Sequence, residues 1–369
     1  MEYKKIPWWD PRIGSPLERT LVEKVFSDNY ANEGDLATQF ETEVAKLLNV
    51  RYAVVTTSGT VALFLALKAS GIGAGDEVIV PDATFIATAN AVSLCGATPI
   101  LVDIDPTTLN ISIEAIENAI TKKTKAIVPV HVTGRPADME RIIEIAKQHN
   151  LKVIEDAAEA FASKHNGKYL GTWGDAGCFS FSAAKTITTG QGGMIVTNDQ
   201  NLYEKLKPLK DQGRPVRGTG GNDLHDTIGY NFKFTNIQSA LGLGQLALLN
   251  ERTERLRRNY TLYKQGLKDV PEVSIFEIDI QGGAVPQWTD AIVECRDELE
   301  AYLRTCNMDC RPFWLPIHKQ KSYPLLDDTF PHATKLLPQA LWFPSAFTLT
   351  DEDVLCVVAK IKEFYSHTK

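Results

Sequence analysis

Seven short runs of branched and aromatic apolar residues recur between residues 50 and 200, with helical patterns between most of them. Their apolar character is nearly continuous rather than alternating, which is typical of strands in a sheet covered on both faces. The order strand–helix–strand predicts a mostly parallel, seven-stranded α/β sheet. Gly192 and Gly193 precede the last run, so at least one of the last two strands is expected to be antiparallel. The runs cover residues 52–56, 77–80, 99–103, 126–130, 152–155, 177–181 and 194–197.

The length of 369 residues favours a large domain followed by a smaller one. Residues 236–267 have one continuous helical pattern, and Pro271 marks a plausible boundary after it. We therefore divide the chain into an N-terminal segment (1–30), a large α/β domain (31–250) and a smaller α+β domain (251–369). The N-terminal segment is expected to pack against the small domain or against a partner subunit.

Composition excludes several classes of protein. The net charge of −7 argues against a nucleic-acid-binding protein. The N-terminus has no signal-peptide pattern, and no apolar stretch is long enough to span a membrane. No histidine has the spacing of a metal ligand. No two cysteines form a CxxC pair, which indicates reduced thiols in a cytoplasmic protein. The six cysteines are Cys95, Cys178, Cys295, Cys306, Cys310 and Cys356.

Lys185 follows an apolar run and enters a Gly- and Thr-rich segment, residues 186–193. A lysine in this position is expected to be desolvated and available as a neutral, imine-forming amine. The alternative is a lysine whose stem follows the strand end while its charge stays in water. A second signal favours the amine, because the run 152–155 ends in Asp156. A strand-end lysine and a strand-end carboxylate in one sheet are the two groups that pyridoxal phosphate requires.

Three features fit a phosphate-bearing cofactor, although each has an ordinary alternative. Ser58, Gly59 and Thr60 follow the first run and open a helix, where backbone N–H groups and hydroxyls bind phosphate. They also fit a plain helix N-cap. Asp156 would keep a pyridine nitrogen protonated, since an ion pair favours the charged form, or it would cap a helix. Phe85, also after a strand, fits either a ring stacked on the cofactor or a core aromatic.

Together these motifs resemble the DegT/DnrJ/EryC1/StrS sugar aminotransferase family, a branch of the aspartate-aminotransferase fold (fold type I). The resemblance covers nearly the whole chain. It implies an aspartate-aminotransferase-like large domain, pyridoxal 5′-phosphate as cofactor, and a homodimer whose subunits share their active sites. The segments that carry the resemblance are residues 58–60, 155–160, 179–185, 189–193 and 229–238.

The resemblance also implies a role for individual residues. Lys185 would form the imine with the cofactor, Asp156 would pair with the pyridine nitrogen, and Phe85 would stack on the ring. Glu159 would also contact the cofactor. The residues expected at the phosphate are Ser58, Gly59, Thr60, Ser180 and, from the neighbouring subunit, Asn231.

Two features are similar to the perosamine synthases of the family, which aminate C4 of GDP-4-keto-6-deoxymannose. Glu159 stands where many members have Gln, and residues 311–318 are similar to an Arg-Pro-Phe-aromatic-x-Pro-x-His segment. Residues 182–184, 212–226 and 287–290 depart from the family pattern, which leaves the sugar and the nucleotide undefined. The candidate substrate ligands are Arg214, Arg217, Lys233, Arg311 and His318; each basic residue taken singly also fits a surface charge.

The sequence therefore predicts an aminotransferase that moves an amino group from glutamate, through pyridoxamine phosphate, to a nucleotide-linked 4-keto-6-deoxy sugar at C4. A C3-specific aminotransferase is the alternative within the family. Related dehydratases carry His at the position of Lys185, so Lys185 argues against that activity. A non-catalytic, cofactor-binding regulator is the alternative from a different class of protein.

Overall fold

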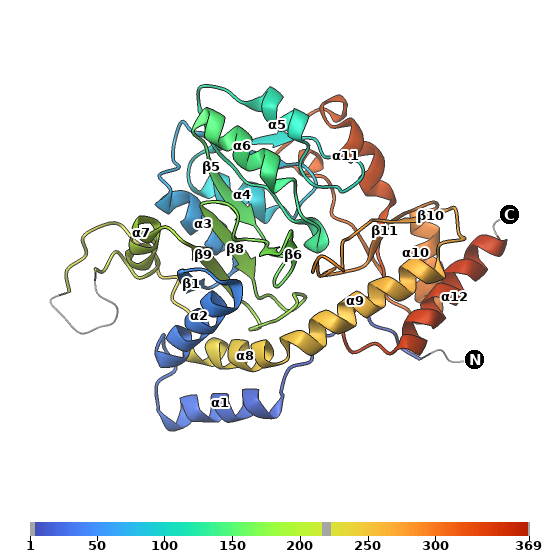
Figure 1. The fold of residues 1–369 in the computed structure, drawn as a ribbon, viewed down its shortest axis with the longest axis horizontal. Coiled ribbons are helices and arrows are strands. Elements are labelled where there is room, and N and C mark those ends of the chain that lie inside the picture. Colours follow the sequence, from blue (N-terminus) through green and yellow to red (C-terminus); the bar gives the residue numbers. More distant parts are fainter. Residues whose placement is uncertain (1–3, 216–222, 368–369) are drawn as a thin grey trace.

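The seven apolar runs form one sheet in the structure of the protein, a computed structural model that describes residues 4–215 and 223–367 (Figure 1). The strands of this sheet are β1 (Tyr52–Thr56), β2 (Glu77–Pro81), β3 (Thr98–Val102), β4 (Thr124–Ile127), β5 (Lys152–Asp156), β8 (Ala176–Ser180) and β9 (Gly193–Thr197). Their order is β1-β9-β8-β5-β4-β2-β3. Strand β9 pairs antiparallel with both β1 and β8, whereas the other pairs are parallel. The predicted mostly parallel sheet with a local antiparallel strand is confirmed.

Helices cover both faces of this sheet. They are α2 (Asp35–Leu48), α3 (Gly59–Ala69), α4 (Ala87–Leu94), α5 (Ile113–Ala119), α6 (Met139–His149), α7 (Gln200–Lys210) and α8 (Asn236–Ala247). Val78 and Val80 of β2 pack in the cluster that includes α3 and α4, whereas Ile79 packs with α5 and α6. Successive strand residues point to opposite faces, so both faces are buried and the apolar runs are continuous.

A second unit follows at the C-terminal end of the chain. Its four strands form an antiparallel sheet in the order β10-β11-β13-β12, and α9, α10 and α12 pack against it. The strands are β10 (Val273–Ile275), β11 (Asp290–Val293), β12 (Arg311–Pro312) and β13 (Ala340–Trp342). The helices are α9 (Leu249–Gly266), α10 (Arg296–Thr305), α11 (Pro331–Leu336) and α12 (Asp351–His367). The α+β character of this unit is confirmed, while the exact domain limits at residues 30 and 250 stay predictions.

Short elements complete the description. A two-stranded sheet joins β6 (Lys164–His165) and β7 (Lys168–Tyr169). The single-turn 3₁₀ helices are η1 (Val132–Gly134), η2 (Ile317–Lys319), η3 (Asp327–Thr329) and η4 (Leu337–Gln339). Among the described residues, no helix combines the length and the apolar character that a membrane span needs.

The predicted continuous helix over residues 236–267 is wrong, because it is interrupted at Leu248 between α8 and α9. The N–H of Leu248 donates to the carbonyls of Gln245 and Leu246 in a tight turn. Before this turn α8 packs on the large sheet, and after it α9 runs toward the second unit (Figure 1). The sequence has neither Gly nor Pro at this point, so nothing local marks the break.

The N-terminal segment contacts both units. Ile6 forms a bridge with Met308 of the second unit. The helix α1 (Pro16–Ser27) lies along α8, where the buried Glu18 accepts a hydrogen bond from Gln245 (2.6 Å) (Figure 1). This segment therefore lies across the junction between the large sheet and the smaller one.

A buried ion pair also ties the units together. Arg135 donates to both carboxylate oxygens of Asp290, at 2.6 and 2.9 Å, and both side chains are buried. We expect Asp290→Ala to lower the free energy of unfolding by about 3–5 kcal/mol, because it leaves a buried guanidinium without its partner. The exposed pair Lys24–Asp28 is the control, and Asp28→Ala should cost less than about 1 kcal/mol. Chemical denaturation measures both; equal losses would contradict the assignment.

Candidate active site

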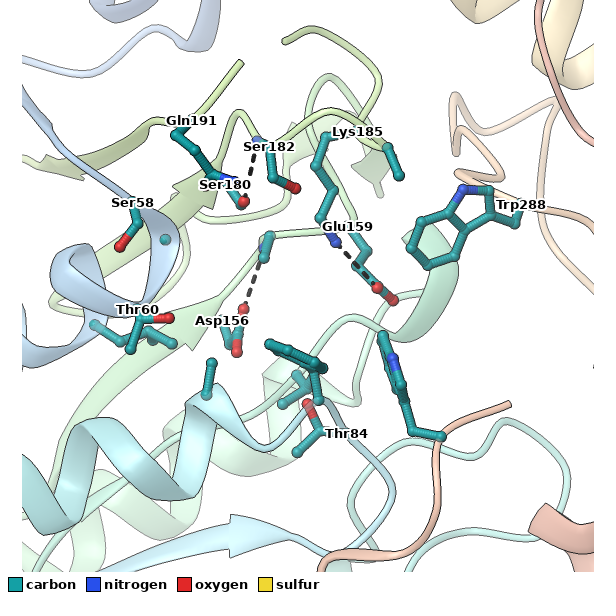
Figure 2. Close-up of a pocket in the computed structure, with 18 of the residues that line it drawn as sticks. Ser58, Thr60, Thr84, Asp156, Glu159, Ser180, Ser182, Lys185, Gln191 and Trp288 are labelled. Atoms are coloured by element: carbon teal, nitrogen blue, oxygen red, sulfur yellow. Dashed lines mark hydrogen bonds and ion pairs between the residues drawn. The ribbon is translucent and has the colours of Figure 1, made fainter. Parts of the chain in front are cut away.

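The largest group of predicted site residues lines one cavity of about 300 Å³ (Figure 2). Its walls come from the start of α3, the carboxyl ends of β5 and β8, and the second unit. Ligands in open α/β sheets bind at the carboxyl ends of the strands, as here. The predicted residues that line it are Ser58, Gly59, Thr60, Phe85, Asp156, Glu159, Ser180, Lys185 and Arg311.

One end of the cavity has the form of a phosphate cradle. Ser58 caps α3, and its hydroxyl accepts a hydrogen bond from the N–H of Val61 (3.2 Å). A Cβ built on Gly59 would lie 2.8 Å from the Cβ of Ser180, so only glycine allows this close approach. The start of α3 therefore lies directly beside Ser180, and both line this end of the cavity. The helix cap and the phosphate site predicted for this segment are compatible with each other.

Asp156, at the end of β5, is one of two buried acids that line the cavity. Its carboxylate accepts hydrogen bonds from the Thr88 hydroxyl (2.8 Å) and the Ala158 N–H (3.1 Å). Burial raises the pKa of Asp156, and these two bonds oppose that shift. No helix directly follows β5, so the helix-capping interpretation of Asp156 is wrong.

Lys185 turns inward rather than toward water, and its side chain is only 13% exposed. Its Nζ lies 3.2 Å from Oε1 of Glu159 and 4.9 Å from the ring centre of Trp288 (Figure 2). Burial raises the pKa of Glu159, while the nearby Lys185 charge and the Thr133 N–H lower it. The alternative of a lysine extended into solvent is therefore wrong.

These residues fit pyridoxal phosphate. The cavity combines an inward-facing amine, a buried carboxylate and a cradle that only glycine can form. Each group matches one part of the cofactor: its aldehyde, its pyridine nitrogen and its phosphate. The roles of the individual residues stay predictions.

Two other predicted residues lie at the rim of the cavity. Phe85 is 52% exposed and its ring centre is 5.8 Å from that of Trp314, so the core-aromatic interpretation is wrong. The Arg311 guanidinium lies over the rings of Trp8 and Trp342, at 5.1 and 5.7 Å. Within the described part of the chain no carboxylate pairs with Arg311, which leaves its charge available to an anionic ligand.

Three predicted residues lie outside this cavity and form a cluster around Asp211. Lys233 donates to Asp211 (3.0 Å) and to Asn231 (2.7 Å), and Arg214 lies 3.6 Å from Asp211. Asn231 is exposed. Arg217 lies outside the described residues.

His318 also lies outside the cavity, contrary to expectation. Its side chain is 0% exposed, its Nδ1 bonds to Asp82 (2.7 Å), and its ring stacks on Phe330. A fully enclosed ring has no surface to offer a substrate, so we no longer propose His318 as a ligand. Burial raises the pKa of Asp82, and the bonds with His318 oppose that shift. Among the residues that the structure describes, no three His, Cys, Asp or Glu side chains are grouped as a metal site.

Sequence reasoning missed several cavity residues. Thr84 lines the cavity, and its hydroxyl lies 3.0 Å from that of Thr88 on α4, which donates to the Asp156 carboxylate from behind the cavity wall. Trp288 and Trp314 form the wall from the second unit. Both tryptophans belong to segments singled out in the sequence, 287–290 and 311–318, whereas no local signal marks Thr88.

Comparisons with known proteins identify the family of this chain. The profile of the DegT/DnrJ/EryC1/StrS aminotransferase family matches residues 13–362. A GDP-perosamine synthase from Escherichia coli O157:H7 is 41% identical over 367 residues, covering 98% of this chain and 99% of that enzyme. A GDP-perosamine synthase from Caulobacter vibrioides is 37% identical over 361 residues, covering 96% of each chain.

The solved structures give the same result. Helicobacter pylori PseC, an aminotransferase involved in pseudoaminic acid biosynthesis, matches with a TM-score of 0.92 and 26% identity, covering 99% of this chain and 100% of that one. The aspartate-aminotransferase-like fold predicted from the sequence is thereby confirmed. With a family match over most of its length and a relative 41% identical, the protein belongs to the DegT/DnrJ/EryC1/StrS aminotransferase family.

Proposed function

We propose that this protein transfers the amino group of glutamate to the C4 keto group of a nucleotide-linked 4-keto-6-deoxy sugar, with pyridoxal phosphate held by Lys185. The observation that carries the proposal is the placement of Lys185 and Asp156 in one cavity beside the Ser58–Thr60 cradle. The similarity to two GDP-perosamine synthases supports amination at C4 and favours a GDP-linked sugar.

Each chemical task has a residue in the cavity. When bound, the cofactor supplies an aldehyde that accepts the amino group and a ring that takes up electron density. Asp156 would hold a proton on the pyridine nitrogen, which would increase that electron uptake. Lys185 Nζ would move a proton between the substrate carbon and C4′ of the bound cofactor. Ser58, Gly59, Thr60 and Ser180 would bind the phosphate and fix the ring between the two groups.

We further propose a homodimer with shared sites. The exposed Asn231 beside Lys233 and Asp211 supports this, because a polar cluster outside the cavity suits contact with the partner's phosphate. We propose Lys233, Arg214 and Arg311 as groups for the nucleotide diphosphate. Cytoplasmic location stays a prediction, supported by six cysteines that are all free thiols.

The function is tested with the protein loaded with pyridoxal phosphate. Glutamate should convert the cofactor to its amine form, and GDP-4-keto-6-deoxymannose should reverse this change and yield a C4 amino sugar. A panel of dTDP- and UDP-linked 3-keto and 4-keto sugars is run in parallel, with products identified by NMR. Amination of a C3 ketone instead would establish the alternative enzyme. Cofactor binding without any amino transfer would instead support the alternative of a non-catalytic, cofactor-binding regulator.

Thr88 provides a test of the Asp156 site. Thr88→Val should weaken cofactor binding and turnover by roughly 10-fold, because it removes a hydrogen bond to a buried carboxylate, worth about 1.5–3 kcal/mol. Thr88→Ser keeps the hydroxyl and should restore most of both. Cofactor titration followed by absorbance, together with turnover, measures the effect. Equal behaviour of the Val and Ser variants would exclude the hydroxyl as the cause.

A further inference from the structure

One side chain from the second unit holds the backbone on both sides of Lys185. Oε1 of Gln287 accepts hydrogen bonds from the N–H (3.0 Å) and the hydroxyl (2.7 Å) of Thr186. Nε2 of Gln287 donates to the carbonyl of Ala184 (3.2 Å). Gln287 is 1% exposed, so water does not compete for these bonds. The residues directly before and after Lys185 are therefore fixed by the same amide.

The orientation of this amide is determined by its partners. Its oxygen faces two donors, and its nitrogen faces an acceptor. A flipped amide would place an NH₂ group against an N–H and a carbonyl against a carbonyl. Because the site is buried, loss of the amide would leave the Thr186 N–H and the Ala184 carbonyl without partners.

Gln287 also connects to the far end of the Lys185 side chain. Its backbone N–H donates to the carbonyl of Thr133 (2.9 Å), and the N–H of Thr133 donates to Oε2 of Glu159 (3.0 Å). The other oxygen of Glu159 lies 3.2 Å from Lys185 Nζ. Gln287 thus contributes both to the backbone from which the lysine side chain starts and to the carboxylate at which it ends.

Thr133 makes this second connection rigid. Its φ of +51° lies in the left-handed region, which is costly for a β-branched residue and persists only where the surroundings impose it. Here Arg135 donates to the Thr133 hydroxyl (2.8 Å). A Cβ on Gly134 would lie 2.0 Å from the carbonyl oxygen of Val285, which shows how closely the two segments pack.

We propose that Gln287 is a positioning residue for Lys185: it sets the place and direction of the reacting amine while touching neither cofactor nor substrate. The inference rests on the proposed role of Lys185 as the cofactor-bearing lysine. A misplacement of about 1 Å at a reacting group costs up to roughly 100-fold in rate.

The test compares Gln287→Met with Gln245→Met. Gln245 is an equally buried glutamine that bonds to the same loop two residues beyond Thr186, at the Thr188 N–H (3.3 Å). The first readout is hydrogen–deuterium exchange at the Thr186 amide in the cofactor-free protein. The second is the rate at which visible absorbance develops after pyridoxal phosphate is added. The third is the kcat and KM for glutamate.

We expect Gln287→Met to expose the Thr186 amide to exchange, to slow the absorbance change by roughly 10- to 100-fold and to lower kcat with little change in KM. Gln245→Met should leave the Thr186 amide protected and the absorbance rate within about 3-fold of the unchanged protein. An absorbance rate for Gln287→Met within about 3-fold of the unchanged protein would overturn the proposal. So would equal slowing in both variants, since general loosening of the loop would then explain it.

If Gln287→Met does not fold, the variant Thr186→Val tests the positioning role of Gln287. It removes only the 2.7 Å hydroxyl bond and should slow the absorbance change in the same direction by a smaller factor, about 3- to 10-fold, whereas an unchanged rate would overturn the proposal. Absence of visible absorbance in the unchanged protein would refute the proposed function instead. The exchange of the Thr186 amide in the cofactor-free protein would still test the positioning contact by itself.

Discussion

Lys185→Ala should abolish the visible absorbance of the cofactor-loaded protein and all measurable amino transfer. Lys185 is the only lysine that lines the cavity among the described residues, so no neighbouring amine can replace it. Loss of a positioned proton-transfer group alone costs about 10²- to 10⁴-fold, and loss of the covalent attachment adds to this. Absorbance spectra and turnover with glutamate measure both effects.

The control for this experiment is Lys24→Ala, which removes an exposed lysine from α1, outside the cavity. It should keep the spectrum and the turnover of the unchanged protein. Turnover that survives in Lys185→Ala, with no added amine present, would end the proposed mechanism.

Asp156→Asn should have opposite effects on activity and on stability. Without the carboxylate the pyridine nitrogen is no longer held protonated, and we expect turnover to fall by at least about 100-fold. In the cofactor-free protein, however, burial raises the pKa of Asp156, because its charged form loses hydration when the chain folds. The ionised carboxylate therefore lowers the free energy of unfolding. The asparagine variant lacks this charge and should therefore melt at a higher temperature near pH 7.

The sign of the pH dependence follows from the raised pKa of Asp156. Below its ordinary value of 3.8 the group is protonated in both states and adds no penalty. As the pH rises, the unfolded chain ionises first, so the unchanged protein loses stability until its folded-state pKa is passed. The advantage of Asp156→Asn should thus grow from about pH 4 upward. A constant difference across pH, measured by thermal melting without cofactor, would contradict this account.

Much of the sheet could be predicted because its signal is local. The inner strands are buried on both faces, and this alone produces a continuous apolar run such as Val78–Val80. The convergence of Lys185, Asp156 and the Ser58–Thr60 turn followed from one topological rule, that the carboxyl ends of strands share an edge. The interruption between α8 and α9 at Leu248, in contrast, has no local sequence signal such as Gly or Pro.

The supporting layer of the site could not be predicted, because it depends on pairs far apart in the chain. Gln287 bonds to residues about a hundred positions earlier, and Thr88 reaches Asp156 across 68 positions. His318 follows a segment that does border the cavity, but its partner Asp82 is 236 positions away and holds the ring beneath the surface. Local sequence identifies the segment that lies near the cavity. The direction of each side chain in that segment is set by its contacts with residues far away in the chain.

The pairing of β1 with β9 has a consequence for how the protein is made. Tyr52 pairs with Thr197, so the first strand of the sheet must wait for about 140 later residues before its partner leaves the ribosome. Its carboxyl end leads into the Ser58–Thr60 cradle, while the turn after β8 carries Lys185. The proposed cofactor site can therefore form only after nearly the whole sheet has been synthesised, and chains truncated before β9 should develop no visible absorbance with pyridoxal phosphate.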